Sequence, residues 1–284
     1  MQLRMIHNGR DRDSLMMPMD PRTIELMLQY SILLERCEPT TRFNVGGTRC
    51  NADGILHDEF GTFHLDPWTD AEWNNFRDNF VRVIMRYWDG KFELTPSRPW
   101  YQPRGAPVAA EAARINCSLS LGLVTATTAA NQHYYIMKVR ETTFRSFAVP
   151  EQRKGLFTHR DLSMHWNTRR TRVSPGVRHS VSYLQCTILH EFGHTLGLQH
   201  VNGSSNSDSA YGVTLEQRED LMGMGDHSTA REAQPWINQL RHHLVPGRGE
   251  PALRFTGRVI SPQLITYWDN DWVPPAQPAQ PAAP

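Results

Sequence analysis

Apolar residues recur on one side of a helix soon after the start of the chain. The segment opens with Asp20-Pro21, a favourable helix start because Asp can cap the first turn and Pro needs no N–H there. The apolar side chains that follow are Ile24, Met27, Leu28 and Leu34. This pattern predicts a short amphipathic helix that ends at Glu38-Pro39.

A longer helical pattern begins after Thr69 and ends at Asp89-Gly90. Large apolar side chains recur in it at steps of three and four: Trp73, Phe76, Phe80, Val83 and Tyr87. Their common face predicts a helix whose aromatic side packs on a sheet. Residues 40–66, before this helix, are rich in Gly, Asn and Asp without a sustained period, which favours a loop with short strands at most.

The second half of the chain first changes to short β-branched and aromatic segments separated by polar turns. These segments are residues 115–125, 134–139, 144–149 and 162–166. They predict a sheet of three to five strands. Helical patterns follow at residues 182–198 and 229–244, and the second opens with the capping-box pattern Thr229-x-x-Glu232. The predicted fold class is therefore α+β.

Three regions are predicted along the chain. Residues 1–39 form an N-terminal extension with one helix, and residues 40–265 form the main domain. Residues 266–284 form a Pro/Ala-rich tail, whose last eleven residues contain five prolines and no side chain able to build a core.

The net charge and the hydropathy of the chain argue against several classes of protein. The chain has 30 Lys and Arg against 29 Asp and Glu, which gives no electrostatic reason to expect a nucleic-acid partner. No apolar run approaches the roughly 18 residues of a membrane span, and the N-terminus does not read as a secretory signal. We expect a globular protein that is cytoplasmic as made, with export by a non-classical or contractile injection route as the alternative.

One short segment, His190 to His200, contains the candidate metal ligands and the candidate proton acceptor. His190 and His194 are four residues apart on the predicted helix, so both imidazoles face one side and can share a metal ion. Glu191 lies beside them, where its carboxylate can take a proton from the attacking water. Gly197 suits a left-handed helix end, and the chain can then fold back to bring His200 to the metal. Three neutral imidazoles with an open fourth position predict one catalytic Zn²⁺.

The segment resembles the metzincin signature HExxHxxGxxH at every fixed position. The resemblance implies a small mixed twisted sheet packed on an aromatic-faced helix and an active-site helix, followed by a Met-turn and a C-terminal helix. It implies that Met222 lies beneath the ligands in the Met-turn, with Met224 as the reserve. It also implies that an edge strand pairs with an extended substrate, for which residues 144–149 are the candidate. Val201, after the third His, matches none of the commoner subfamilies, so the subfamily stays open.

Three further features have competing interpretations. Tyr211 could reach the site and stabilise a developing oxyanion, although a packing or surface role is the expected one. The four cysteines are scattered and expected to be reduced; Cys37 and Cys50 could bridge in an oxidising compartment. The segment around Cys50 weakly resembles the cysteine switch of matrixin propeptides, but a buried Cys is the simpler expectation. Residues 206–208 lack a regular calcium-ligand spacing and are expected to be a loop.

The sequence thus predicts a zinc-dependent endopeptidase that acts on a protein or peptide substrate with Glu191 as general base, and an exported effector or toxin is one setting for it. One alternative is a non-catalytic zinc-containing module that binds peptides. Another is a cargo subunit of a secretion or injection assembly that docks through its Pro-rich tail. Glu191 favours the enzyme, because a non-catalytic site has no need of that carboxylate.

Overall fold

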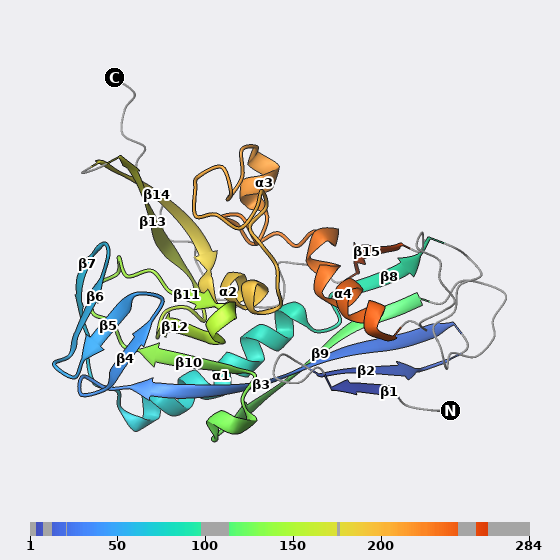
Figure 1. The fold of residues 1–284 in the computed structure, drawn as a ribbon, viewed down its shortest axis with the longest axis horizontal. Coiled ribbons are helices and arrows are strands. Elements are labelled where there is room, and N and C mark those ends of the chain that lie inside the picture. The colour runs from blue at the N-terminus through green and yellow to red at the C-terminus, as the bar shows by residue number, and fades with distance from the viewer. Residues whose placement is uncertain are drawn as a thin grey trace.

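The computed structural model describes residues 4–7, 13–20, 22–97, 114–174, 177–243 and 254–260. In this part of the chain the fold is α+β, with a large mixed sheet, a small antiparallel sheet, a long hairpin and few helices (Figure 1). The predicted fold class is confirmed at that level. The predicted tail of residues 266–284 lies outside the described residues.

The large sheet has nine strands within the described ranges, more than the three to five expected. Seven of them run in the spatial order β11 (Phe147–Val149), β12 (Lys154–Thr158), β10 (Gln132–Met137), β3 (Thr23–Cys37), β9 (Arg114–Val124), β8 (Phe92–Pro96) and β15 (Phe255–Val259). The other two, β1 (Arg4–His7) and β2 (Asp13–Pro18), extend it beside β3. Strands β9, β3, β10 and β12 are parallel to one another, and the remaining strands each pair antiparallel with their neighbours.

The predicted N-terminal helix is wrong, because these residues form the long central strand β3. Alternate side chains of β3 are buried on one face: Ile24, Leu26, Leu28, Tyr30 and Ile32. Ile24 and Leu28 also belong to the helical pattern, but strand neighbours on both edges of β3 take up its backbone hydrogen bonds. The described part of residues 1–39 therefore forms strands β1, β2 and β3 and no helix, and the predicted boundary at residue 39 comes just after a central strand of the sheet.

The aromatic helix is confirmed as α1 (Asp70–Trp88). Thr69 and Glu72 form a capping box at its start, and Asp89 is its C-cap. Its buried face is formed by Phe76, Phe80, Ile84, Tyr87 and Trp88. This face joins the main core between α1 and the large sheet, so α1 packs on a sheet as its pattern predicted (Figure 1).

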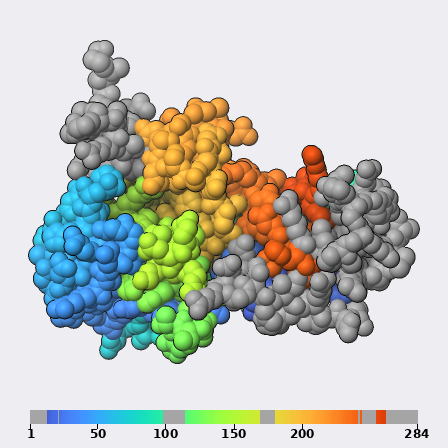
Figure 2. Space-filling model, in the orientation of Figure 1, coloured from blue at the N-terminus to red at the C-terminus, as the bar shows by residue number. Residues whose placement is uncertain are grey.

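Residues 40–66 form more than a loop. They fold into a four-stranded antiparallel sheet of β4 (Arg42–Val45), β5 (Thr48–Asn51), β6 (Ile55–Asp58) and β7 (Gly61–His64). This sheet has a small core of its own, which includes Cys37, Phe43, Cys50 and Leu56. On the face shown in Figure 2 it lies in blue at one end of the molecule, and the segment after residue 200 lies in orange above the middle.

The remaining elements lead to and away from the His190 segment. The predicted strand at 162–166 is the start of β13 (Met164–Ser174), which pairs with β14 (Val177–Cys186). The predicted helix at 182–198 is wrong over its first five residues, which end β14, and the helix is α2 (Thr187–Thr195). Beyond it follow α3 (Leu215–Glu219), a 3₁₀ turn (Ala230–Ala233) and α4 (Gln234–His243), and the capping box of Thr229 and Glu232 is present. No helix in the described ranges is long and apolar enough to cross a membrane.

The assignment of β3 can be tested by comparing two adjacent residues. Leu26→Ala should lower the free energy of unfolding by about 2–5 kcal/mol, because Leu26 is fully buried. Met27→Ala should lower it by about 1 kcal/mol, because Met27 is half-buried on the opposite face. Urea denaturation of both variants measures the difference. A helix with the predicted register would give the reverse order, since Met27 would then lie on the apolar face.

Candidate metal centre

The three predicted histidines come together at one end of α2. The His190 and His194 rings lie 4.8 Å apart on one face of the helix. Gly197 then takes a φ of +96°, a left-handed conformation that favours glycine, and the Leu198 N–H bonds back to the Gly193 carbonyl at 2.9 Å. The chain folds back there and brings His200 alongside, as the spacing predicted. One nitrogen of each of the three rings lies within 4.8 Å of those of the other two.

Backbone carbonyls orient all three rings. The Nδ1 atoms lie 2.7 Å from the Leu221 oxygen for His190, 2.8 Å from the Leu198 oxygen for His194 and 3.0 Å from the Ser205 oxygen for His200. A carbonyl only accepts hydrogen bonds, so in each neutral ring Nδ1 carries the proton and Nε2 presents a lone pair. This is the arrangement by which a second group fixes the tautomer of a metal-ligating histidine.

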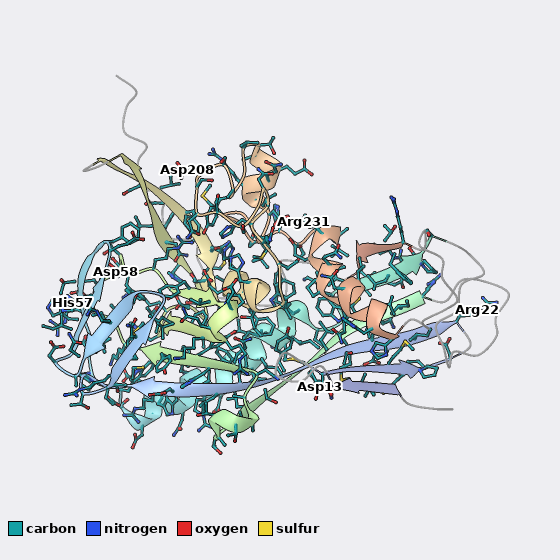
Figure 3. The ribbon with its side chains drawn as sticks, viewed as in Figure 1. Asp13, Arg22, His57, Asp58, Asp208 and Arg231 are labelled. Atoms are coloured by element: carbon teal, nitrogen blue, oxygen red, sulfur yellow. The ribbon has the colours of Figure 1, made fainter. Side chains whose placement is uncertain are left out.

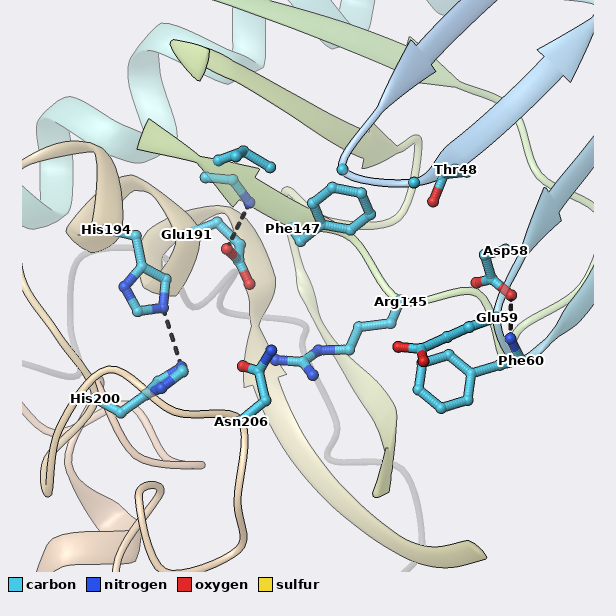
Figure 4. A pocket seen from close by; sticks show the side chains of 14 residues that line it. Thr48, Asp58, Glu59, Phe60, Arg145, Phe147, Glu191, His194, His200 and Asn206 are labelled. Atoms are coloured by element: carbon cyan, nitrogen blue, oxygen red, sulfur yellow. Dashed lines mark hydrogen bonds between the residues drawn. The ribbon is translucent and has the colours of Figure 1, made fainter. Parts of the chain in front are cut away.

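The three Nε2 atoms converge, and none of them carries a proton. The Nε2 of His190 is buried and has no hydrogen-bond partner among the described residues. The Nε2 atoms of His194 and His200 lie 3.1 Å apart (Figure 4). Two lone pairs at this distance repel each other, and a cation between them removes the repulsion. The three histidines can therefore bind a metal ion, and three imidazoles are typical ligands of Zn²⁺.

The surroundings of His190 and His194 favour the neutral form of both rings. Burial and the neighbouring His194 and His200 hold the pKa of His190 well below its usual value. Burial likewise lowers the pKa of His194. Neutral rings are the form that coordinates metal ions, so folding prepares these ligands before the ion arrives.

Glu191 lies between α2 and the edge of the large sheet. Its carboxylate accepts the Ala148 N–H at 2.8 Å, and Ala148 belongs to β11, which pairs with only one strand in the described part of the sheet. Burial raises the pKa of Glu191 to about 7, although Arg145 and the Ala148 N–H oppose the shift. A carboxylate with such a pKa is suited to accept and return a proton near neutral pH.

Met222 lies beneath the metal helix. Its side chain is fully buried, and a Cβ added to Gly193 would collide with its Sδ atom. Gly193 immediately precedes His194, so the thioether supports α2 between the two helical ligands. Met224 is partly exposed, and the structure therefore places the first choice, Met222, at this position.

Tyr211 reaches the site from the loop after the third histidine. It is fully buried, and its ring centroid lies 3.9 Å from that of His200. Its hydroxyl accepts a hydrogen bond from the Arg145 guanidinium. The tyrosine thus packs on a ligand and lies at the site, and its part in stabilising an oxyanion stays a prediction.

The cysteines and the segment at 206–208 add no ligand to the three histidines in the described part of the chain. The four cysteines are free and buried, and Cys50 belongs to the core of the four-stranded sheet. Among the described residues, the only group of three or more His, Cys, Asp or Glu placed to hold a metal consists of His190, His194 and His200. Asn206 lines the cavity beside these histidines, and Asp208 lies in the same loop (Figures 3 and 4).

Two residues that the sequence did not single out hold the ligand shell together. Gln185, buried at the end of β14, donates to the Leu221 and Gly225 carbonyls at 3.0 and 2.7 Å. Arg231 donates to the Gln199 and His200 carbonyls at 2.6 and 2.7 Å, and its Nη1 lies 3.8 Å from Asp220. Neither residue belongs to a periodic pattern, and the only available signal was the position of Arg231 inside the Thr229 capping box.

Comparisons with protein-family models, with curated proteins and with solved structures give no match for this chain. The arguments below therefore rest on the residues and geometry of the site.

Gly193 should not tolerate a side chain. Gly193→Ala places a methyl group against Met222 and should destabilise the protein by about 1–3 kcal/mol and weaken zinc binding, because α2 must shift. Thermal unfolding with and without zinc measures both effects. In Gly193→Ala/Met222→Ala the cavity left by Met222 accommodates the methyl group. If the two substitutions are simply additive, there is no direct contact between them.

Arg231 should act on metal affinity through the backbone of His200. Arg231→Met removes both hydrogen bonds to this segment and should raise the zinc dissociation constant roughly 10–100-fold. Competition with a chromogenic chelator measures the constant. Arg258→Met, which breaks an ion pair with Glu93 on the strand pair β8–β15, is the matched control and should leave the constant unchanged. Equal zinc affinity in both variants would show that Arg231 does not position His200.

Proposed function

We propose that this protein is a zinc-dependent endopeptidase of the metzincin kind. One observation carries the proposal: three imidazole nitrogens converge beside a buried carboxylate that is itself bonded to an open sheet edge. A metal-binding site alone would explain the histidines. It would not explain a buried glutamate aimed at the strand where a peptide can bind.

In the proposed reaction the histidines bind the metal ion and Glu191 transfers the proton. His190, His194 and His200 hold the zinc ion, which when bound polarises a carbonyl and makes water more acidic. Glu191 accepts a proton from the attacking water and returns it to the leaving amine, so no covalent intermediate with the protein is needed. Its pKa of about 7 allows it to act in both directions near neutral pH.

Strand β11 offers the substrate a backbone partner. Phe147 and Val149 flank Ala148, and β11 pairs antiparallel with β12 on one side only among the described strands. Because the Ala148 N–H reaches Glu191, the backbone groups of Ala148 face the unpaired edge. Because Glu191 takes up the Ala148 N–H, an extended peptide that adds to this edge would bond to the Ala148 carbonyl and lie beside Glu191, with its scissile bond next to the histidines.

The function can be tested with three samples: the wild type, Glu191→Gln and His194→Ala. The wild type should bind about one equivalent of zinc and degrade unfolded casein. Glu191→Gln should keep the zinc and lose roughly 10²–10⁴-fold in rate, because only the proton acceptor is removed. His194→Ala should lose both zinc and activity. Mass spectrometry of the metal content and a casein assay give these results.

Other results would favour different functions. Zinc bound with no cleavage of casein or of a diverse peptide library by the wild type would favour the peptide-binding module or the cargo subunit. A wild type that binds no zinc would contradict the proposal as a whole.

A further inference from the structure

A cavity of about 560 Å³ opens beside the metal ligands and contains a single cationic side chain among the described residues. Its lining comes from the turns of the four-stranded sheet, from the segment at 145–149, and from Glu191, His194, His200 and Asn206. Among the described residues of this lining, Arg145 is the only Lys or Arg. In Figure 4 its side chain extends into the space between the four-stranded sheet and the loop of Asn206.

Arg145 interacts electrostatically with the Glu191 carboxylate, but it has no close ion-pair partner among the described residues. Its guanidinium donates to the hydroxyl of Tyr211, a neutral group, and no described carboxylate lies within ion-pair distance of it. A guanidinium has five N–H donors in a planar fork, and one bond to a phenol uses only part of this capacity. Arg145 is also partly buried, which makes a charge without a close ion-pair partner costly.

Three carboxylates line the same cavity as Arg145: Asp58, Glu59 and Glu191. An Asp58 oxygen accepts the N–H groups of Phe60 and Gly61 at 2.7 and 2.8 Å. The Glu191 carboxylate bonds to Ala148 and serves as the proton acceptor in the proposed reaction. None of the three forms an ion pair with Arg145 in the described part of the chain, so none supplies the bidentate partner that a guanidinium prefers.

Arg145 lies close to the path that a bound peptide would take. It precedes Ala148 by three residues, which is at most about 10 Å along an extended chain. A peptide that pairs with β11 beside Glu191 would therefore carry its neighbouring side chains past the guanidinium, within about three residues of the scissile bond.

From this geometry we infer that Arg145 determines specificity by binding a carboxylate of the substrate close to the scissile bond. The carboxylate belongs either to an Asp or Glu side chain or to the C-terminus of the peptide. The inference rests on the proposed function, since it assigns a substrate class to the same site. Arg145 forms a bidentate pair with this group while its remaining donor holds Tyr211 against His200.

The test uses quenched fluorescent peptides that differ only in charge. One series replaces Asp and Glu by Asn and Gln at each of the three positions on either side of the cleaved bond, and a second compares free with amidated C-termini. For the zinc-loaded wild type, kcat/KM should be roughly 10–100-fold higher with the carboxylate, as expected for a hydrogen-bonded charge pair. The series that shows the difference identifies the source of the carboxylate.

Variants then assign the preference to Arg145. Arg145→Gln should remove it, Arg145→Lys should keep part of it, and Arg145→Glu should favour peptides with Lys at the same position. Tyr211→Phe is the matched control, because it removes the hydroxyl contact and leaves the guanidinium, so the ratio between acidic and neutral peptides should persist. Circular dichroism and zinc content establish that each variant is folded.

A binding measurement separates this inference from the proposed function. Zinc-loaded Glu191→Gln and its double variant with Arg145→Gln are titrated with the labelled acidic and neutral peptides, and fluorescence anisotropy reports binding. Tighter binding of acidic peptides that depends on Arg145 supports the inference even where no cleavage occurs. Equal binding and equal kcat/KM for both peptides, or a preference that survives in Arg145→Gln, overturns it while leaving the peptidase itself intact.

Discussion

The carbonyl oxygen of Leu221 is the point at which the metal centre is joined to the rest of the fold. It accepts the Nδ1 proton of His190 at 2.7 Å and the amide of Gln185 at 3.0 Å. One oxygen with two lone pairs thus connects His190, the end of β14 and the turn that contains Leu221. Each of these segments is buried at this point, so losing one partner would leave a polar group without a hydrogen bond in the core. The orientation of His190 therefore depends on the turn that follows it by about thirty residues.

The large sheet fixes the opposite end of the metal helix. The hydroxyl groups of Tyr30 on β3 and Tyr134 on β10 both bond to Thr195, one to its carbonyl and one to its side chain. The ring of Phe192 packs edge-on against that of Tyr30. Residue Thr195 directly follows His194, so the central strands determine where the second ligand lies. The strand β3 is thereby part of the architecture of the site as well as of the core.

A feature of the fold or of the site could be predicted from the sequence where the contacts that determine it are close together along the chain. The ligands, Glu191 and the turn at Gly197 follow from spacing within one helix, and α1 follows from its own capping box and aromatic face. The residues of β3 fit both a helical and a strand pattern. Neighbours such as β9, about ninety residues away, decide in favour of the strand, which is why the predicted helix is wrong. Arg145, Gln185 and Arg231 carry no local pattern, and their roles arise only when distant carbonyls and hydroxyls fold around them. Local chemistry could thus be predicted, and the parts that position it could not.

The sheet edge and the metal centre are connected through Glu191. In the proposed reaction Glu191 has to stay turned toward the peptide, and its bond to the Ala148 N–H restrains the carboxylate at strand β11. The same strand begins just after Arg145, whose contact with Tyr211 extends the linkage to the loop of His200. Residues 145–148 are thus linked to Glu191 through the Ala148 N–H and to the loop of His200 through Arg145 and Tyr211.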